Sequence, residues 1–238
     1  LHEKGCPWDG DALDVAVRHD NWEVVSYLVQ HGCPWKADTV DNWTKKGDAE
    51  RLAKLLSHGV TVSKSAIVYA IRQRSLPCLV LLHEHGCCLK ADAIAEAIRV
   101  DSVECLKYLH HHGCPWGTPA LQLFYSSFST DCIKFALENG CTFDRRENLC
   151  NECAQMGELK LLTIFREHGY PCDESTMHAA CLAGRCKIVA YLLEVGCPVK
   201  IESVAKCVQH RDIEMLKAFH AHGTPWDGSL CDVAIQYR

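Results

Sequence analysis

Cysteine and histidine are the residue types whose number and spacing first suggest chemistry in this sequence. The chain of 238 residues contains 17 cysteines and 14 histidines. Thiolate and imidazole groups are preferred zinc ligands, and a structural zinc site needs four of them. Cys150 and Cys153 form a C-x-x-C pair, which Cys141 and Cys172 could complete. One such pair is weak evidence, so we expect a packed helix at these positions and no bound metal or other cofactor.

Histidine also recurs directly before a glycine. The histidines are His31, His58, His85, His112, His168 and His222. Because zinc–nitrogen bonds are about 2 Å long, ligands separated by a whole structural repeat cannot share one ion. A histidine at the end of a helix interacts favourably with the last carbonyl groups, so we expect these imidazoles to cap helices.

Sequence patterns typical of catalysis are absent. The chain has no glycine-rich phosphate loop, no G-x-S-x-G and no H-E-x-x-H. Cysteine and histidine are so abundant that any pairing of the two carries little information. We therefore predict that the chain is not an enzyme.

Composition narrows the classes of protein to which the chain can belong. Hydrophobic residues make up 48% and charged residues 23%, which is typical of a globular protein with a sizeable core. The net charge of −5 does not favour binding to nucleic acid. No apolar run reaches the roughly 20 residues of a membrane helix. Disulfide frameworks stabilise small domains with poor cores, so we expect reduced thiols and an intracellular, cytoplasmic protein.

Glycine recurs at a fixed interval and reveals an internal repeat. The glycines are Gly5, Gly32, Gly59, Gly86, Gly113, Gly140, Gly169, Gly196 and Gly223. The interval is 27 residues, apart from one of 29 between Gly140 and Gly169. A constant period of this length is typical of a solenoid.

Each repeat is predicted to contain two short helices. In the first repeat, residues 12–17 form one helix and residues 22–30 the next, with Asn21 as N-cap. Gly32 ends the second helix, because a helix C-terminus favours a residue that tolerates the left-handed conformation. On the packed face of this helix we expect Val24, Val25, Tyr27 and Leu28.

The same arrangement is predicted in the later repeats. The capping position is taken by Asp48, Ser75, Ser102, Ser129 and Asp212. Apolar pairs on the second helix are Leu52/Leu55, Leu79/Leu82, Leu106/Leu109, Leu162/Phe165, Val189/Leu192 and Leu216/Phe219. Neither helix can bury its apolar face alone, so the repeats must stack. The connections have little alternating pattern, and we predict an all-α protein without a sheet.

The repeats resemble those of the ankyrin family. Residues 174–184 read E-S-T-M-H-A-A-C-L-A-G and residues 187–197 read K-I-V-A-Y-L-L-E-V-G-C. They are similar to the ankyrin patterns T-P-L-H-x-A-A-x-x-G and E-V-V-x-L-L-L-x-x-G-A. The resemblance implies one ankyrin-type solenoid over residues 1–238, with about eight repeats and partial units at both ends. Partial units indicate a fragment of a longer protein.

The repeat length departs from the ankyrin pattern. Ankyrin repeats have about 33 residues, against 27 in this chain. The missing residues fall between the glycine and the next helix, where ankyrin repeats carry a projecting β-hairpin. We therefore expect shortened or absent hairpins.

Two further repeat positions are expected to serve packing. A cysteine follows the glycine at Cys6, Cys33, Cys87, Cys114, Cys141 and Cys197. It stands where ankyrin repeats have alanine, so we expect a small buried side chain. A tryptophan recurs at Trp8, Trp35, Trp116 and Trp226, where we expect it to cover the core.

Four cations at one repeat position are the best candidates for a binding site. Arg18, Lys45, Arg72 and Arg99 are each 27 residues apart, near the end of the first helix of their repeats. The ankyrin resemblance implies that this end borders the concave surface, and Tyr69 lies beside it. One interpretation is ordinary solvated charge. The other is a stripe that binds an acidic segment of a partner protein.

The function predicted from these features is a protein–protein interaction module or scaffold that binds its partner on the concave surface. The alternative is the substrate-recognition arm of a longer enzyme or multiprotein assembly. A metal- or redox-responsive protein that uses the cysteines is the third and least favoured interpretation. A second candidate contact is the irregular middle of the chain around Tyr125. The sequence does not indicate an oligomeric state.

Overall fold

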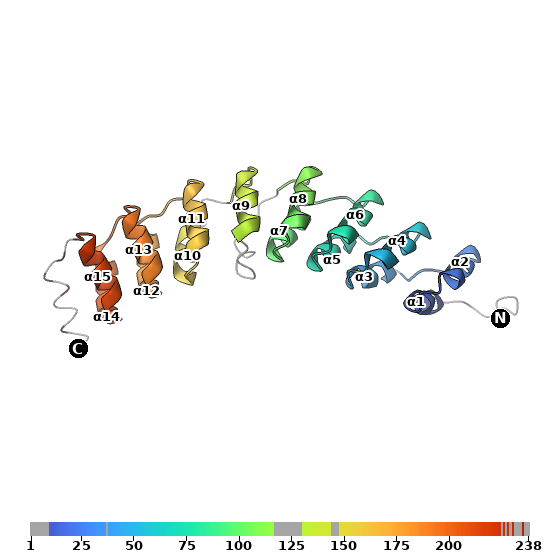
Figure 1. Ribbon diagram of the computed structural model, residues 1–238, viewed down its shortest axis with the longest axis horizontal. Helices are drawn as coiled ribbons and strands as arrows, with labels where there is room; N and C mark the ends of the chain where they lie inside the picture. Colours follow the sequence, from blue (N-terminus) through green and yellow to red (C-terminus); the bar gives the residue numbers. More distant parts are fainter. Residues whose placement is uncertain are drawn as a thin grey trace. The chain divides into compact units, whose positions relative to one another are not determined.

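The computed structural model describes residues 10–36, 38–116, 130–143 and 148–224, together with residues 226, 228, 230 and 235. Every regular element in these residues is a helix, and none is a strand (Figure 1). The all-α class and the paired helices predicted from the sequence are therefore confirmed. The chain divides into two compact units, unit 1 at residues 1–135 and unit 2 at residues 136–238.

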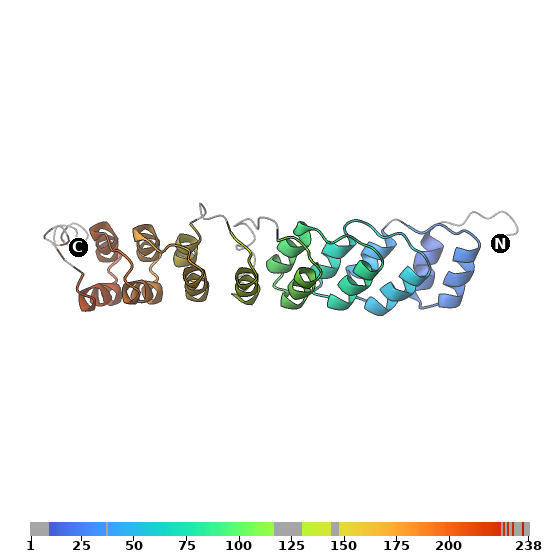
Figure 2. The ribbon, with the colours of Figure 1, turned by 90° about the horizontal axis from the view of Figure 1, so that it is seen from above.

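Within its described residues, unit 1 contains four helix pairs in two layers (Figure 2). The first helices of the pairs are α1 (Gly10–Arg18), α3 (Thr39–Thr44), α5 (Ala66–Arg72) and α7 (Ala91–Arg99). The second helices are α2 (Trp22–Gln30), α4 (Ala49–Ser57), α6 (Leu76–Glu84) and α8 (Val103–His111). Each helix packs against its own partner, α5 also packs between α3 and α7, and α6 packs between α4 and α8.

The described part of unit 2 repeats this arrangement with three helix pairs. They are α10 (Leu149–Met156) with α11 (Leu159–Glu167), α12 (Glu174–Leu182) with α13 (Cys186–Glu194), and α14 (Ile201–Gln209) with α15 (Ile213–Ala221). Helix α12 packs between α10 and α14. Helix α9 (Thr130–Glu138) contains the boundary between the two units.

Side-chain caps start most of the second helices where the sequence predicts them. Asn21 accepts a hydrogen bond from the Val24 amide at 3.3 Å. The same bond is made by Asp48, Ser75 and Asp212 in their repeats. Ser102 takes the predicted N-cap position of α8, but it is buried and makes no capping bond through its side chain. Ser129 lies outside the described residues.

A left-handed residue makes the sharp turn between the two helices of a pair. Gly47 takes this position with φ +70°, which glycine adopts at little cost because it lacks a Cβ. Asp20, Arg74, Asp101 and Arg211 hold the same position with φ between 52° and 56°. Side chains at this φ are disfavoured by roughly 1–2 kcal/mol, so tertiary packing imposes the turn there.

The core follows the predicted pattern with corrections at the ends of the units. Val25 and Leu28 are buried, but Val24 is 41% exposed and Tyr27 53% exposed, against prediction. At the Val24 position of later repeats, Cys78 is fully buried because α4 packs beside α6. No second helix precedes α2 among the described residues. In α15, Met215 and Phe219 are buried while Leu216 is only half-buried.

The repeated cysteines that the structure describes are small core residues, as predicted, except Cys87, which is half-buried. Cys6 lies outside the described residues. Those with an exposed fraction below a tenth are Cys33, Cys114, Cys141 and Cys197. Burial is the main cause that raises the pKa of Cys114 to about 11. Cys114 Sγ also donates to the Lys90 carbonyl oxygen at 3.1 Å, and Cys197 Sγ donates to that of Asp173 at 3.2 Å. These bonds tie each repeat to the preceding loop.

The predicted capping role of histidine is confirmed at four of the six positions. The imidazole Nδ1 of His31, His58, His85 and His168 lies 2.7–2.9 Å from the carbonyl oxygen four residues earlier. A carbonyl only accepts, so Nδ1 must carry the proton. In the His58 side chain, the unprotonated Nε2 can then accept from Ser26 Oγ at 2.9 Å. His112 instead packs against Tyr108, with ring centroids 4.2 Å apart and the ring planes tilted by 40°.

The repeated tryptophans differ in how much core they cover. Trp35 and Trp116 are half-buried, and Trp116 stacks on His110 with ring centroids 4.9 Å apart. Trp226 is 49% exposed, so it covers the core less well than predicted. Trp8 lies outside the described residues.

Candidate partner-binding surface

The four predicted cations define a feature that we call the basic row: Arg18, Lys45, Arg72 and Arg99. Arg18, Arg72 and Arg99 are the last residues of α1, α5 and α7, and Lys45 directly follows α3. The first three side chains of the row are exposed, and Arg99 is half-buried. Because α5 packs against both α3 and α7, Lys45, Arg72 and Arg99 lie at the ends of neighbouring helices.

Tyr69 connects the second and third members of the row. The Lys45 ammonium lies 4.3 Å from the centre of the Tyr69 ring, and the Arg72 guanidinium carbon lies 5.9 Å from it. Cations at these distances from an aromatic ring are attracted by its quadrupole. The ring therefore holds two positive charges close together at the surface.

Glu96 connects the third and fourth members. Its Oε1 lies 2.6 Å from both Arg72 Nε and Arg99 Nη2, and its Oε2 lies 2.9 Å from Arg99 Nε. The bond from Arg99 has the largest effect and lowers the pKa of Glu96, partial burial opposes it, and Arg72 adds to the lowering. At neutral pH the three side chains carry a net charge of +1.

The other end of the row opens onto a hollow of about 480 Å³, whose lining includes Arg18, Lys45, Lys46, Trp43 and Asp14. The Lys46 ammonium lies 3.9 Å from the centre of the Trp43 ring. Asp14 is buried and accepts a hydrogen bond from Thr39 Oγ1 at 2.9 Å. Three cations thus face one carboxylate, and the hollow favours an anionic ligand.

Sequence analysis missed Glu96 and Trp43. Glu96 lies three residues before Arg99 on one helix, a spacing that allows contact. The contact between Glu96 and Arg99 could therefore have been predicted from this spacing. The bond from Arg72 depends on how α5 packs on α7, which the spacing alone does not give. Tyr125, the remaining predicted contact, lies outside the described residues.

The candidate zinc ligands lie in packed structure. Cys150 and Cys153 are buried within α10, as the packed-helix interpretation predicts. A hydrogen bond with Cys172 is the largest cause that raises the pKa of Cys150, and burial adds to it. The same hydrogen bond lowers the pKa of Cys172, and burial opposes that effect. In the part of the chain that the structure describes, no three cysteine, histidine or acidic residues are arranged to hold a metal ion.

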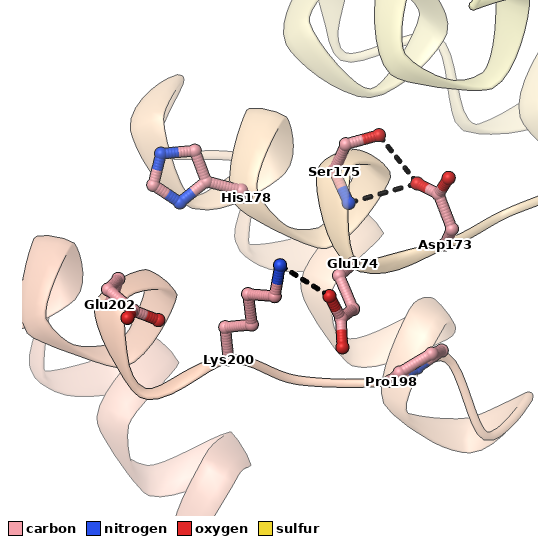
Figure 3. A pocket seen from close by; sticks show the side chains of 7 residues that line it. All are labelled: Asp173, Glu174, Ser175, His178, Pro198, Lys200 and Glu202. Carbon is pink, nitrogen blue, oxygen red and sulfur yellow. Dashed lines mark hydrogen bonds and ion pairs between the residues drawn. The ribbon is translucent and has the colours of Figure 1, made fainter.

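Unit 2 has a polar pocket of about 660 Å³ on its loop side, next to the starts of α12 and α14 (Figure 3). Lys200 Nζ forms an ion pair with Glu174 Oε2 at 2.6 Å. Asp173 Oδ1 accepts from both the amide and the hydroxyl of Ser175, at 2.9 and 2.5 Å. The single lysine of this pocket is therefore neutralised within the chain.

Comparisons with known proteins give fold-level similarity only. No family model matches the chain. No curated protein matches it. Among solved structures, the human ASB11 ankyrin repeat domain is 15% identical over 78% of this chain and 84% of its own, with a TM-score of 0.36.

A second similar structure is the pentatricopeptide repeat protein PPR10, in complex with an 18-nt psaJ RNA element. It is 13% identical over 95% of this chain, with a TM-score of 0.33. This chain spans 46% of its length. Similarity at this level does not identify a ligand, so the function must be inferred from the side chains of this chain.

The chain is a helical-repeat protein, a fold that usually binds macromolecules and is usually not catalytic. None of the described helices has the length and apolar composition needed to span a bilayer.

Proposed function

We propose that this chain is an ankyrin-type interaction module that binds an acidic segment of another protein along the basic row. The single-solenoid organisation over residues 1–238 remains part of this proposal, as do Tyr125 and the concave location of the row. A binding role of this kind serves equally in a free scaffold and in the recognition arm of a longer protein.

The observation that carries the proposal is the position of Glu96. A carboxylate within the chain already occupies the space between Arg72 and Arg99, with two of its bonds at 2.6 Å. Guanidinium groups in this arrangement suit carboxylate binding by geometry as well as charge. The hollow beside Arg18 and Lys45 offers two further cations, and among its described lining residues Asp14 is the one acid that opposes them.

Charge alone gives weak binding. An exposed ion pair contributes roughly 0.2–1 kcal/mol, so four contacts supply at most about 4 kcal/mol, which corresponds to a dissociation constant of about 1 mM. A tighter complex needs apolar contacts, and the rings of Tyr69 and Trp43 are the ones beside the cations. The proposed ligand is therefore acidic with interspersed apolar residues.

The test uses a fluorescein-labelled peptide with glutamate at every third position and leucine and serine between them. Three extended residues span about 10 Å, close to the spacing of packed helices. Fluorescence anisotropy at low ionic strength should detect binding that weakens as salt is added. The double variant Arg18→Glu/Lys45→Glu should bind at least about tenfold more weakly, because two attractive contacts become repulsive.

The matched control is Lys160→Glu/Lys187→Glu, which changes the net charge equally at two exposed lysines of unit 2. This control should keep most of the affinity. A second control peptide carries glutamine in place of glutamate and should not bind. Equal loss in both double variants would mean that the peptide responds to net charge, and the basic row would not be the site.

A further inference from the structure

A second pocket of unit 1 lies at the opposite end of α5 from the basic row. Its volume is about 450 Å³, within the range of ligand sites. The floor includes the buried side chains of Val60 and Ile67. Lys64 and Lys90 line it as well, one from the loop before α5 and the other from the loop before α7. Helix α5 is about 10 Å long, so the pocket and Arg72 are separate sites.

Lys90 belongs to a lysine position that recurs four residues after the repeat glycine. In unit 1, Lys36 at this position forms an ion pair with Asp11. In unit 2, Lys200 pairs with Glu174 at 2.6 Å (Figure 3). Both partners come from the start of the preceding first helix, so the chain itself normally supplies this lysine with a carboxylate.

The pocket between α5 and α7 lacks that carboxylate. Glu174 stands five residues after its repeat glycine, and the residue at the same position before α5 is Lys64. A second cation therefore stands where unit 2 has the partner of Lys200. In the described ranges, with their gaps, neither Lys64 nor Lys90 forms an ion pair with an acidic side chain.

The other described residues of the lining do not offset the positive charge of Lys64 and Lys90. The lining residues that the structure describes include no aspartate or glutamate. Asp41 accepts a hydrogen bond from Ser63 Oγ at 2.6 Å but lies outside the lining. His85 adds an imidazole whose Nδ1 is used on the Leu81 carbonyl oxygen at 2.9 Å. The pocket thus combines two lysines with an apolar floor.

We propose that this pocket binds an acidic peptide, with a carboxylate between Lys64 and Lys90 and a neighbouring apolar side chain against Val60 and Ile67. The carboxylate takes the place that Glu174 has beside Lys200 in unit 2. The apolar floor selects a peptide over a small inorganic anion, because burial of the adjacent side chain adds to affinity. This inference does not rest on the basic row, which uses other residues.

Cys88 provides a reporter inside the pocket. Its side chain is exposed and belongs to the lining, whereas burial is the main cause that raises the pKa of its neighbour Cys87. The experiment measures the rate at which iodoacetamide alkylates Cys88, by mass spectrometry. The probe is the acetylated and amidated peptide Leu-Glu-Leu-Glu at millimolar concentration. A peptide concentration equal to the dissociation constant should halve the rate if the bound peptide covers the thiol.

The decisive variant is Lys64→Glu. It puts a carboxylate where unit 2 has Glu174, so Lys90 gains a partner within the chain, and protection of Cys88 should be lost while the urea midpoint does not fall. Lys90→Gln should weaken binding about two- to fivefold. The matched control is Lys200→Gln at the same repeat position, which should leave protection unchanged. The basic-row variant Arg18→Glu/Lys45→Glu should also leave it unchanged.

Three results would overturn the proposal. Equal protection by the peptide Leu-Gln-Leu-Gln would show that the carboxylate is not recognised. Equal protection by inorganic phosphate would show a simple anion site without a role for the apolar floor. Unchanged protection in folded Lys64→Glu would show that the two lysines do not bind the ligand.

Discussion

Glu96 makes the sharpest prediction about the basic row, because its neutralisation should lower stability and raise affinity at once. The variant Glu96→Gln keeps the size of the side chain and removes its charge. In the native protein the carboxylate is 11% exposed and holds Arg72 and Arg99 together. The variant should leave both arginines in place without their common partner.

The expected loss of stability follows from the exposure of the groups involved. The carboxylate is largely buried, but the side chains of Arg72 and Arg99 are 49% and 36% exposed, which screens their charges. Hydrogen bonds to charged groups contribute about 1.5–3 kcal/mol when they are shielded from solvent, and exposed ion pairs contribute less. We therefore expect Glu96→Gln to lower the free energy of unfolding by about 1–2 kcal/mol.

The affinity of the Glu96→Gln variant for an acidic peptide should increase. The charge of the three-residue cluster rises from +1 to +2, and the two guanidinium groups no longer have to exchange an internal carboxylate for an external one. One additional exposed ion pair with the peptide contributes roughly 0.2–1 kcal/mol, so binding should tighten about 1.4- to 5-fold. Its salt dependence should become steeper.

The stability difference between the native protein and the variant should depend on pH. The pKa of Glu96 is lowered from its ordinary value of 4.5, so its contribution to stability is complete above that value. The contribution is lost as the pH falls through the lowered pKa of the folded state. The difference in unfolding free energy should therefore be constant near neutral pH and shrink below about pH 4.5.

Urea unfolding followed by circular dichroism measures the free energy of unfolding, and fluorescence anisotropy with the glutamate peptide measures the affinity. The matched control is Glu84→Gln, an exposed glutamate at the end of α6, which should change stability by less than about 0.5 kcal/mol. A variant that loses stability without a gain in affinity would refute the binding role of Arg72 and Arg99. Their bonds to Glu96 would then serve structure alone.

Four further predictions concern the repeat itself. Leu192→Ala, at a fully buried position, should cost about 2–5 kcal/mol in urea unfolding, whereas exposed Lys187→Ala on the same helix should stay within about 0.5; similar losses would mean that the packing register is wrong. Gly47→Ala should cost about 1–2 kcal/mol, because a residue with a Cβ is disfavoured at φ +70°. A steric clash adds nothing to this cost, since a Cβ at position 47 would meet no atom closer than 3.8 Å. Arg74→Gly at the same repeat position should be neutral or stabilise by up to about 1 kcal/mol, and a loss in thermal melting would contradict this. His58→Ala should cost about 1–2 kcal/mol through two lost side-chain bonds, and an unchanged melting temperature would show that neither bond contributes.

Much of the local structure follows from the sequence because it depends on contacts within one repeat. The spacing of glycines and the capping position at Asn21 predicted the second helix at residues 22–30, the bounds that α2 has. The imidazole bond of His58 also lies within one helix turn. Such features need only the residues near them in the chain, which the sequence displays directly.

Contacts between repeats were decided by tertiary structure. Arg72 reaches Glu96 only because α5 packs on α7 at one rotation, and periodicity does not fix that rotation. Likewise, the sequence shows Lys64 and Lys90, but not that they line one pocket. The sequence by itself determined the helices, their pairing and the row of cations. Which charges are paired and which remain available was decided by packing, because ion pairs form over a few ångströms between residues distant in the chain.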